Sequence, residues 1–186
     1  MTLDEFFEDL DHYESPIPLE ELREKMELLK VNLPDLNGAL RFGEKNYRRT
    51  LLHKGPAYEA LLICWSHGQR SPIHDHRGSA CGVRVLCGSA TETRFELSGK
   101  GYVHPVGTDR LSEGETTASA DADIHQVSNL QGDRTDLVTL HVYSPPLRSM
   151  RSYSIDSSDP EGTFGPAFRS RQGAVPERSD IKINKS

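Results

Sequence analysis

Two histidines separated by one residue, His74 and His76, are the residues of this sequence whose spacing points most directly to chemistry. Successive side chains of a β-strand point to opposite faces, so an extended His-x-His segment directs both imidazoles the same way. Gly68 and Gly88 flank the pair where we expect turns, and we interpret the segment between them as a hairpin that carries the ligands. The pattern predicts a metal site.

A second set of polar residues lies on one predicted strand near the end of the regular pattern. Thr139, His141 and Tyr143 alternate there with aliphatic residues, so they share one face of the strand. A histidine two residues from a tyrosine on that face can hydrogen-bond the phenol and orient it as a proton donor towards a bound ligand. This face therefore belongs to a predicted site rather than to an ordinary core.

Two consecutive arginines, Arg48 and Arg49, follow Tyr47 on the first predicted strand. Alternation sends one guanidinium into the interior and the other outward. A buried guanidinium requires a planar anion, and a substrate carboxylate held by two hydrogen bonds would supply it. Alternation alone does not decide which arginine points inward.

Length and composition restrict the class of protein. A chain of 186 residues allows one well-buried core, and its formal net charge of −6 without a basic cluster argues against binding nucleic acid. No apolar run approaches the length of a membrane span, and the N-terminus is acidic where a signal peptide is basic. Cys64, Cys81 and Cys87 lack zinc-ribbon spacing and indicate a reducing compartment. We expect a monomeric cytoplasmic protein that binds neither nucleic acid nor membranes.

Hydrophobic periodicity divides the chain into three segments of one predicted structural domain. Residues 1–42 show two amphipathic patterns, which predict two helices packed outside a larger unit. Residues 43–150 change to period two, with predicted strands at 47–53, 57–65, 71–77, 82–87, 90–97, 116–120, 125–130 and 137–143. Residues 151–186 are rich in Ser, Gly, Pro and charge, which predicts an extended C-terminal arm. We expect an all-β fold, either a closed barrel or a double-sheet jelly roll.

The histidine pair and its glycines resemble the first motif of the cupin superfamily, G-x5-H-x-H-x4-[E]-x6-G, with Cys81 at the position of the usual glutamate. His125 and Asn129 resemble the end of the second cupin motif, although the proline and glycine that usually precede the histidine are missing. The resemblance implies a small cupin β-barrel with three neutral imidazoles at one end. Such a ligand set suits Fe, Ni, Cu and Zn alike.

Longer stretches of the chain resemble the type I cysteine dioxygenases, which are thiol dioxygenases of the cupin superfamily. The resemblance covers roughly residues 47–146 and includes, besides the motifs above, Cys64-Trp65, Glu92-Thr93 and Leu140-His141-Val142-Tyr143-Ser144-Pro145-Pro146. It implies a mononuclear Fe(II) cofactor, without an organic one, and a cis bond at Ser144-Pro145.

The resemblance also implies a role for each candidate residue. His74, His76 and His125 correspond to the iron ligands. Arg49, in a Tyr-x-Arg pattern with Tyr47, corresponds to the residue that binds the substrate carboxylate. Tyr143 corresponds to the active-site tyrosine, with His141 and Thr139 as its relay. Cys81 stands where animal enzymes carry a cysteine joined to that tyrosine by a thioether.

The predicted function is oxidation of the thiol of free L-cysteine to L-cysteine sulfinate with O2. One alternative is a related dioxygenase that acts on 3-mercaptopropionate; in that branch the position of Arg49 resembles a glutamine, so Arg49 argues against it. The other is a non-enzymatic cupin that binds a metal or small molecule as a sensor, which leaves the polar row of Thr139, His141 and Tyr143 without a role.

Overall fold

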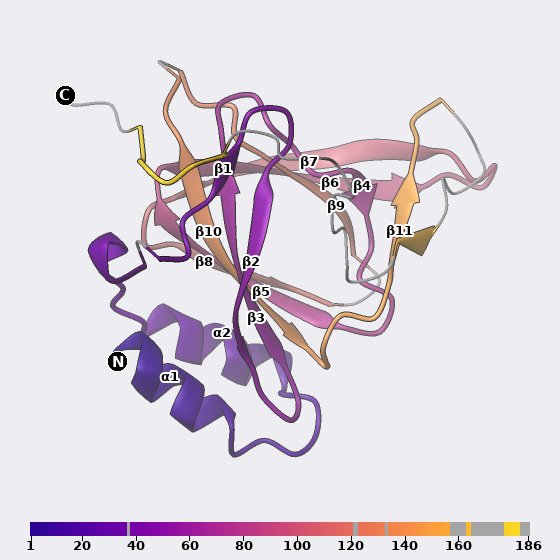
Figure 1. Ribbon diagram of the computed structural model, residues 1–186. Helices are drawn as coiled ribbons and strands as arrows, with labels where there is room; N and C mark the ends of the chain where they lie inside the picture. Colours follow the sequence, from indigo (N-terminus) through magenta and orange to yellow (C-terminus); the bar gives the residue numbers. More distant parts are fainter. Residues whose placement is uncertain (37, 121–122, 133, 157–162, 165–176, 183–186) are drawn as a thin grey trace.

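The computed structural model describes the chain except for residues 37, 121–122, 133, 157–162, 165–176 and 183–186. Two antiparallel sheets face each other, and two helices lie against the outer face of one of them (Figure 1). No helix among the described residues is long and apolar enough to cross a membrane.

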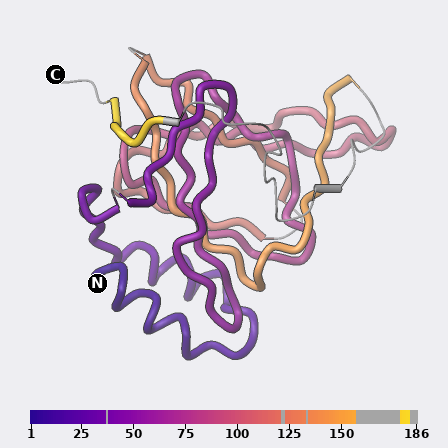
Figure 2. The backbone as a smooth tube through the Cα atoms, viewed as in Figure 1, coloured from indigo at the N-terminus to yellow at the C-terminus, as the bar shows by residue number. Residues whose placement is uncertain are grey.

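Two helices, α1 (Leu3–Leu10) and α2 (Leu19–Glu27), form the N-terminal segment. Thr2 caps α1, because its hydroxyl accepts from the Glu5 backbone N–H while the Glu5 carboxylate accepts from the Thr2 backbone N–H. The buried side chains of the helices are Phe6, Phe7, Leu10, Leu22 and Met26. These side chains form one hydrophobic cluster with buried residues of the strands. Both helices lie outside the sheets, as predicted (Figure 2).

The strands form a five-stranded sheet, a six-stranded sheet and one short pair. The five-stranded sheet has the order β2 (Arg48–Lys54), β3 (Glu59–Trp65), β10 (Leu137–Ser144), β5 (Ala80–Cys87), β8 (Thr116–Ser119). The six-stranded sheet has the order β12 (Thr163–Phe164), β11 (Met150–Tyr153), β4 (Ile73–His74), β9 (Ile124–Ser128), β6 (Ser89–Leu97), β7 (Val103–Ser112). β1 (Phe42–Gly43) pairs with β13 (Glu177–Arg178), and a 3-10 turn spans Leu33–Leu36. The described strands do not close into one barrel, so the fold is the double-sheet form of the jelly roll.

Strand β10 separates two packed layers. Its aliphatic residues Val138, Leu140 and Val142 join the core beneath the helices, whereas Leu137 and Tyr143 join the core between the sheets. Alternation therefore turns the polar face of β10 towards the six-stranded sheet. Every residue of this strand is buried, so the polar row lies in the interior.

The predicted hairpin around the histidine pair is wrong. β4 contains only Ile73–His74 and belongs to the six-stranded sheet, whereas β5 belongs to the five-stranded sheet. The chain crosses between the sheets instead, through a turn at which Arg77 and Gly78 have φ of 41° and 98°. The predicted strand at 71–77 is therefore too long, although Gly68 and Gly88 do adopt the positive φ of turns.

The sequence pattern does not predict β7, a strand of ten residues. β7 is an edge strand that pairs with β6 alone among the described strands, and most of its side chains are exposed. Pro105 and the charged residues of this strand prevent the apolar alternation by which strands are recognised, and both are common on edges.

Most of the predicted C-terminal arm, residues 151–186, lies outside the described residues. The described parts continue as strands, with β11 beside β4 and β13 beside β1. Arg178 forms an ion pair with the buried Asp136, with Nη2 2.5 Å from Oδ1. The backbone N–H of Lys182 donates to the same carboxylate at 2.6 Å.

Candidate active site

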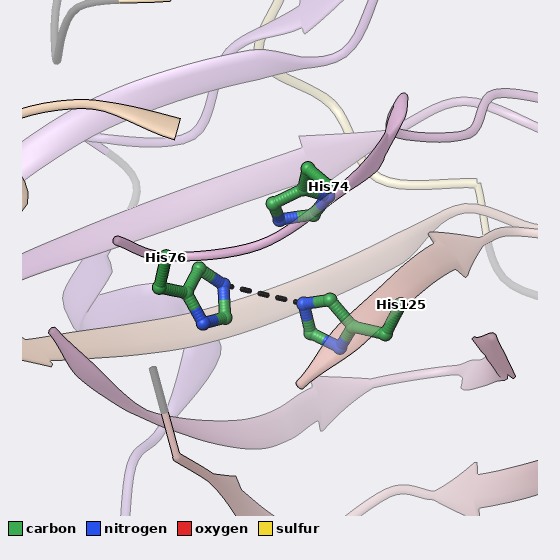
Figure 3. Close-up of side chains that lie close together, drawn as sticks. All are labelled: His74, His76 and His125. Atoms are coloured by element: carbon green, nitrogen blue, oxygen red, sulfur yellow. Dashed lines mark hydrogen bonds between the residues drawn. The ribbon is translucent and has the colours of Figure 1, made fainter. Parts of the chain in front are cut away.

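Three buried histidines meet between the two sheets (Figure 3). His74 on β4 and His125 on β9 are directly paired across the strands, and His76 follows β4 by two residues. One ring nitrogen of each histidine lies within 4.8 Å of the others. The Nε2 atoms of His76 and His125 are 3.2 Å apart.

Hydrogen bonds orient two of the three rings. Nδ1 of His74 lies 2.9 Å from the carbonyl oxygen of Pro72, and Nδ1 of His125 lies 2.6 Å from Oε1 of Glu92. Both acceptors place the proton on Nδ1 and leave the Nε2 lone pair directed at the other histidines. Nδ1 of His76 has no partner among the described residues. Two nitrogens that bind one ion at about 2.1 Å lie about 3 Å apart, so the 3.2 Å between the Nε2 atoms of His76 and His125 fits a shared transition metal, with a nitrogen of His74 within 4.8 Å of both.

Burial keeps the imidazoles of His74 and His76 neutral. It lowers the pKa of His74 well below the ordinary value, and it lowers the pKa of His76 to about 2, with repulsion from His125 as a further cause in both. Neutral imidazole is the form that binds metals, so His74 and His76 are already in the ligand form.

Glu92 is a site residue to which the sequence analysis, although it named Glu92 within the family resemblance, assigned no role. It comes from β6, and its carboxylate is buried against His125. A carboxylate in this position fixes the tautomer and direction of a ligating histidine and raises its basicity. The sequence does show an acidic residue at an inward position of a predicted strand, which could have indicated a role in the site. It does not show that the strand of His125 lies next to it.

Asp75, between the two histidines, fixes their segment to the neighbouring strand β11. Its side chain accepts from the hydroxyl of Tyr153 at 2.6 Å and from the backbone N–H of Arg151 at 3.2 Å. Alternation thus directs His74 and His76 to the site and Asp75 to β11. The sequence reasoning assigned no role to Asp75 or Tyr153.

The polar face of β10 forms the opposite wall and carries a continuous chain of hydrogen bonds. The indole Nε1 of Trp65 donates to Oγ1 of Thr139 at 2.9 Å, and that hydroxyl lies 3.0 Å from Nε2 of His141. Nδ1 of His141 lies 3.4 Å from the phenol oxygen of Tyr143. The ring of Tyr143 packs against that of His76, with the centroids 5.4 Å apart.

The direction of this chain follows from its first donor. Indole is only a donor, so the Thr139 oxygen accepts from Trp65, and its proton is available to Nε2 of His141. Because burial lowers the pKa of His141 well below its ordinary value, the ring is neutral and its one proton lies on Nδ1, facing Tyr143. The phenol oxygen thus accepts, and its own proton remains for a group in the site.

Cys81 on β5 is the directly paired cross-strand neighbour of Tyr143. Both side chains are buried, and the Cys81 sulfur lies 3.9 Å from Nδ1 of His141. Burial raises the pKa of the Cys81 thiol, and it raises the pKa of the Tyr143 phenol well above the ordinary value. Both groups are therefore protonated at neutral pH.

Strand register decides between the two arginines. Arg49 pairs with Ile63, which faces the core between the sheets, whereas Arg48 pairs with Cys64, which faces the helices. Arg49 therefore shares the face of the site. Its guanidinium carbon lies 5.6 Å from the ring centroid of Tyr47, which stacks in turn on Trp65 at 4.3 Å.

Among the described residues, no anionic group pairs with Arg49. Nη2 lies 3.9 Å from the sulfur of Met150, while Nε and Nη1 are shielded from solvent and have no hydrogen-bond partner among the described residues. A thioether is only a weak acceptor. The structure thus places the three histidines on one wall of the site and Arg49, Cys81, Thr139, His141 and Tyr143 on the other, with Met150 added from β11.

Solved structures with the same architecture establish the fold class. A Thermus thermophilus protein superposes with a TM-score of 0.50 at 18% identity, covering 63% of this chain and 97% of its own. A Klebsiella pneumoniae protein with a double-stranded β-helix domain superposes with a TM-score of 0.50 at 13% identity, covering 64% and 94%. At these identities the likeness concerns the cupin fold alone.

Sequence comparison extends the relationship to a family. A protein named cysteine dioxygenase type 1 from Danio rerio is 30% identical over 175 residues, which cover 91% of this chain and 85% of the relative. The protein of the same name from Homo sapiens is 28% identical over 141 residues, covering 74% and 70%. The sequence model of the family described as cysteine dioxygenase type I matches residues 12–156, the stretch that contains every histidine of the metal cluster and both walls of the site. The chain therefore belongs to the cysteine dioxygenase type I family.

Proposed function

We propose that this enzyme oxidises the thiol of free L-cysteine to L-cysteine sulfinate, with both oxygen atoms of O2 transferred to the sulfur. Family membership supports a thiol dioxygenase with a metal cofactor. The proposed metal is Fe(II), held by His74, His76 and His125. The three cysteines are free and buried, which agrees with action in a reducing cytoplasm.

The observation that carries the substrate assignment is the unpaired guanidinium of Arg49. A buried cation without an anion is costly, and among the described residues the guanidinium has only the Met150 sulfur as a hydrogen-bond partner. A substrate carboxylate would remove this cost and be held by charge-assisted hydrogen bonds. Tyr47 packs along the guanidinium and limits its movement, which favours one position for the bound carboxylate.

The donor set supports a thiolate as the other end of the substrate. Three neutral imidazoles leave the charge of a divalent ion uncompensated, so an anionic sulfur ligand is favoured. Bound Fe(II) would supply thiolate coordination and the electrons that activate O2. A thiol with a carboxylate a few bonds away satisfies both Arg49 and the histidine cluster.

Tyr143 would act as the proton donor that orients the substrate. The chain from Trp65 through Thr139 and His141 leaves the phenol proton directed away from His141, and the raised pKa keeps that proton in place at neutral pH. We assign Thr139 and His141 as positioning residues for this phenol. Cys81 limits the space beside the ring and is a candidate for covalent linkage to it.

Oxygen consumption by the iron-loaded protein with three thiols tests the proposal. L-cysteine, 3-mercaptopropionate and cysteamine differ in whether a carboxylate and an amine are present. We expect the largest kcat/KM with L-cysteine and a loss of about 2 to 4 kcal/mol in transition-state binding with cysteamine, which leaves Arg49 unpaired. Preference for 3-mercaptopropionate would transfer the assignment to that thiol, and no uptake with any of the three would refute it. Protein loaded with Zn(II) is the control for iron.

A further inference from the structure

A groove between two sheet edges leads to the metal cluster from the side. β7 is an edge of the six-stranded sheet and β8 an edge of the five-stranded sheet, and a turn at Gly114 joins them. The groove has a volume of about 930 Å³, and its lining extends from both edge strands to Glu92 and His125. It therefore reaches a histidine of the cluster without passing Arg49, which lies on β2 at the opposite edge of the five-stranded sheet.

Exposure decreases along the groove. At the mouth, Arg94 and Asp109 form an ion pair at 3.1 Å with side chains 58% and 53% exposed. Further in, the side chains of Glu92 and His125 are 10% and 3% exposed. Cross-strand pairing of Glu92 with Asp109 and of Arg94 with His125 places these four residues in adjacent rows of one sheet face. The groove lining therefore runs from solvent-exposed side chains at the mouth to one buried histidine of the cluster, His125.

Negative charge dominates the lining. Four carboxylates, those of Glu92, Glu96, Asp109 and Asp123, face one guanidinium, that of Arg94. A cleft of one sign concentrates counter-ions and accelerates their association, and it repels ions of its own sign. The groove therefore suits a cation and disfavours a thiol that carries a carboxylate.

We propose that the groove between β7 and β8 is the path by which the divalent metal ion reaches His74, His76 and His125, separate from the side on which Arg49 binds substrate. The acidic mouth concentrates the ion, and the inner end of the groove, which Glu92 and His125 line, lies beside the cluster. This proposal rests on the metal site of the proposed function but not on the identity of the thiol.

Filling the groove distinguishes a path from a binding site. Thr117 on β8 pairs with Val83 of the core between the sheets, so its side chain points inward and lines the groove. In Thr117→Phe we expect the association and dissociation rates of Co²⁺ to fall severalfold together. A blocked path changes neither the free nor the bound state of the protein, so the equilibrium Kd should stay the same. Quenching of Trp65, the single tryptophan, follows binding in stopped flow. Thr93→Phe on β6, outside the groove lining, is the matched control and should bind Co²⁺ at the wild-type rate.

Removing charge at the mouth provides an independent measurement if Thr117→Phe does not fold. Glu96→Gln with Asp109→Asn should lower the Co²⁺ association rate roughly tenfold at low salt and weaken its salt dependence. Glu8→Gln with Glu24→Gln removes the same charge from exposed positions on the helices and should leave the rate unchanged.

Three results would overturn the proposal. The first is unchanged association rates in both groove variants while the equilibrium Kd is normal. The second is a Kd that changes as much as the association rate in Thr117→Phe. The third is a raised KM for L-cysteine with normal Co²⁺ kinetics, which would assign the groove to the substrate. Absence of Co²⁺ binding to the wild-type protein at equilibrium would instead refute the metal site itself.

Discussion

Glu92 and His125 meet across the pairing of β6 with β9, with Oε1 of the carboxylate 2.6 Å from Nδ1 of the imidazole. We expect Glu92→Gln to weaken metal binding by about 10- to 100-fold, because the amide keeps the shape of the contact but loses the charge that raises the basicity of the ring. Equilibrium titration with Co²⁺ measures the effect. Glu113→Gln, an exposed carboxylate on the β7–β8 turn, is the control, and equal affinity in the two variants would contradict the role of Glu92.

Removal of each histidine tests the ligand set. In His74→Ala, His76→Ala and His125→Ala we expect iron and activity to be lost together while the fold remains, because a buried imidazole is replaced by a small apolar side chain. Metal content by atomic emission and far-UV circular dichroism measure the two outcomes. Full iron occupancy in His125→Ala would show that the third ligand is another residue, with His141 and His104 the next to test. His12→Ala, at an exposed position, is the control.

The sequence predicts the site better than the path of the chain around it. Period-two alternation identifies the polar face of β10 without any knowledge of its neighbours, because alternation is a local property of a strand. The choice of Arg49 over Arg48 depends on pairing with Ile63, and the role of Glu92 depends on the adjacency of β6 and β9. Adjacency is a long-range property, and the pattern gives no measure of it. The crossing from β4 to β5 is missed for the same reason.

The two arginines provide a matched pair of variants. Arg49→Gln should raise the KM for L-cysteine by a loss of about 2 to 4 kcal/mol of charge-assisted binding and should improve the relative turnover of 3-mercaptopropionate. Arg48→Gln, whose side chain faces the helices, should change KM little. Steady-state kinetics with both thiols decide the matter, and the opposite pattern would mean that the register of β2 is shifted by one residue.

Buried neutral histidines make the stability of the metal-free protein dependent on pH. The pKa values of His74, His76 and His141 are lowered in the fold, chiefly by burial, while unfolded histidines titrate near 6.5. The unfolded state therefore binds more protons below that pH, so the contribution of these histidines to the free energy of unfolding is constant above pH 7 and falls as the pH decreases from 6.5. Each histidine contributes a slope of about 1.4 kcal/mol per pH unit.

Urea unfolding of the metal-free protein between pH 5 and 8 measures this slope. His141→Gln should reduce it by about 1.4 kcal/mol per pH unit, whatever its effect on absolute stability. His104→Gln, at an exposed position of β7, should leave it unchanged. A stability that does not vary between pH 5 and 6.5 would mean that these histidines are not neutral and buried.

The direct pairing of Cys81 with Tyr143 leads to the last prediction, a thioether between the two side chains. Loss of the thiol hydrogen and of one ring hydrogen ortho to the phenol, with O2 as oxidant, would join sulfur to carbon and make the chain lighter by two hydrogens. Because turnover would produce the link, we expect two species after prolonged incubation with L-cysteine, Fe(II) and air. The linked species should migrate faster on a denaturing gel, since the bond closes a loop of the chain.

Cys81→Ala and Tyr143→Phe should abolish the faster-migrating species, whereas Cys64→Ala should not. Peptide mapping of turned-over protein in which both residues remain on separate, unmodified peptides would refute the link and leave the dioxygenase assignment unaffected.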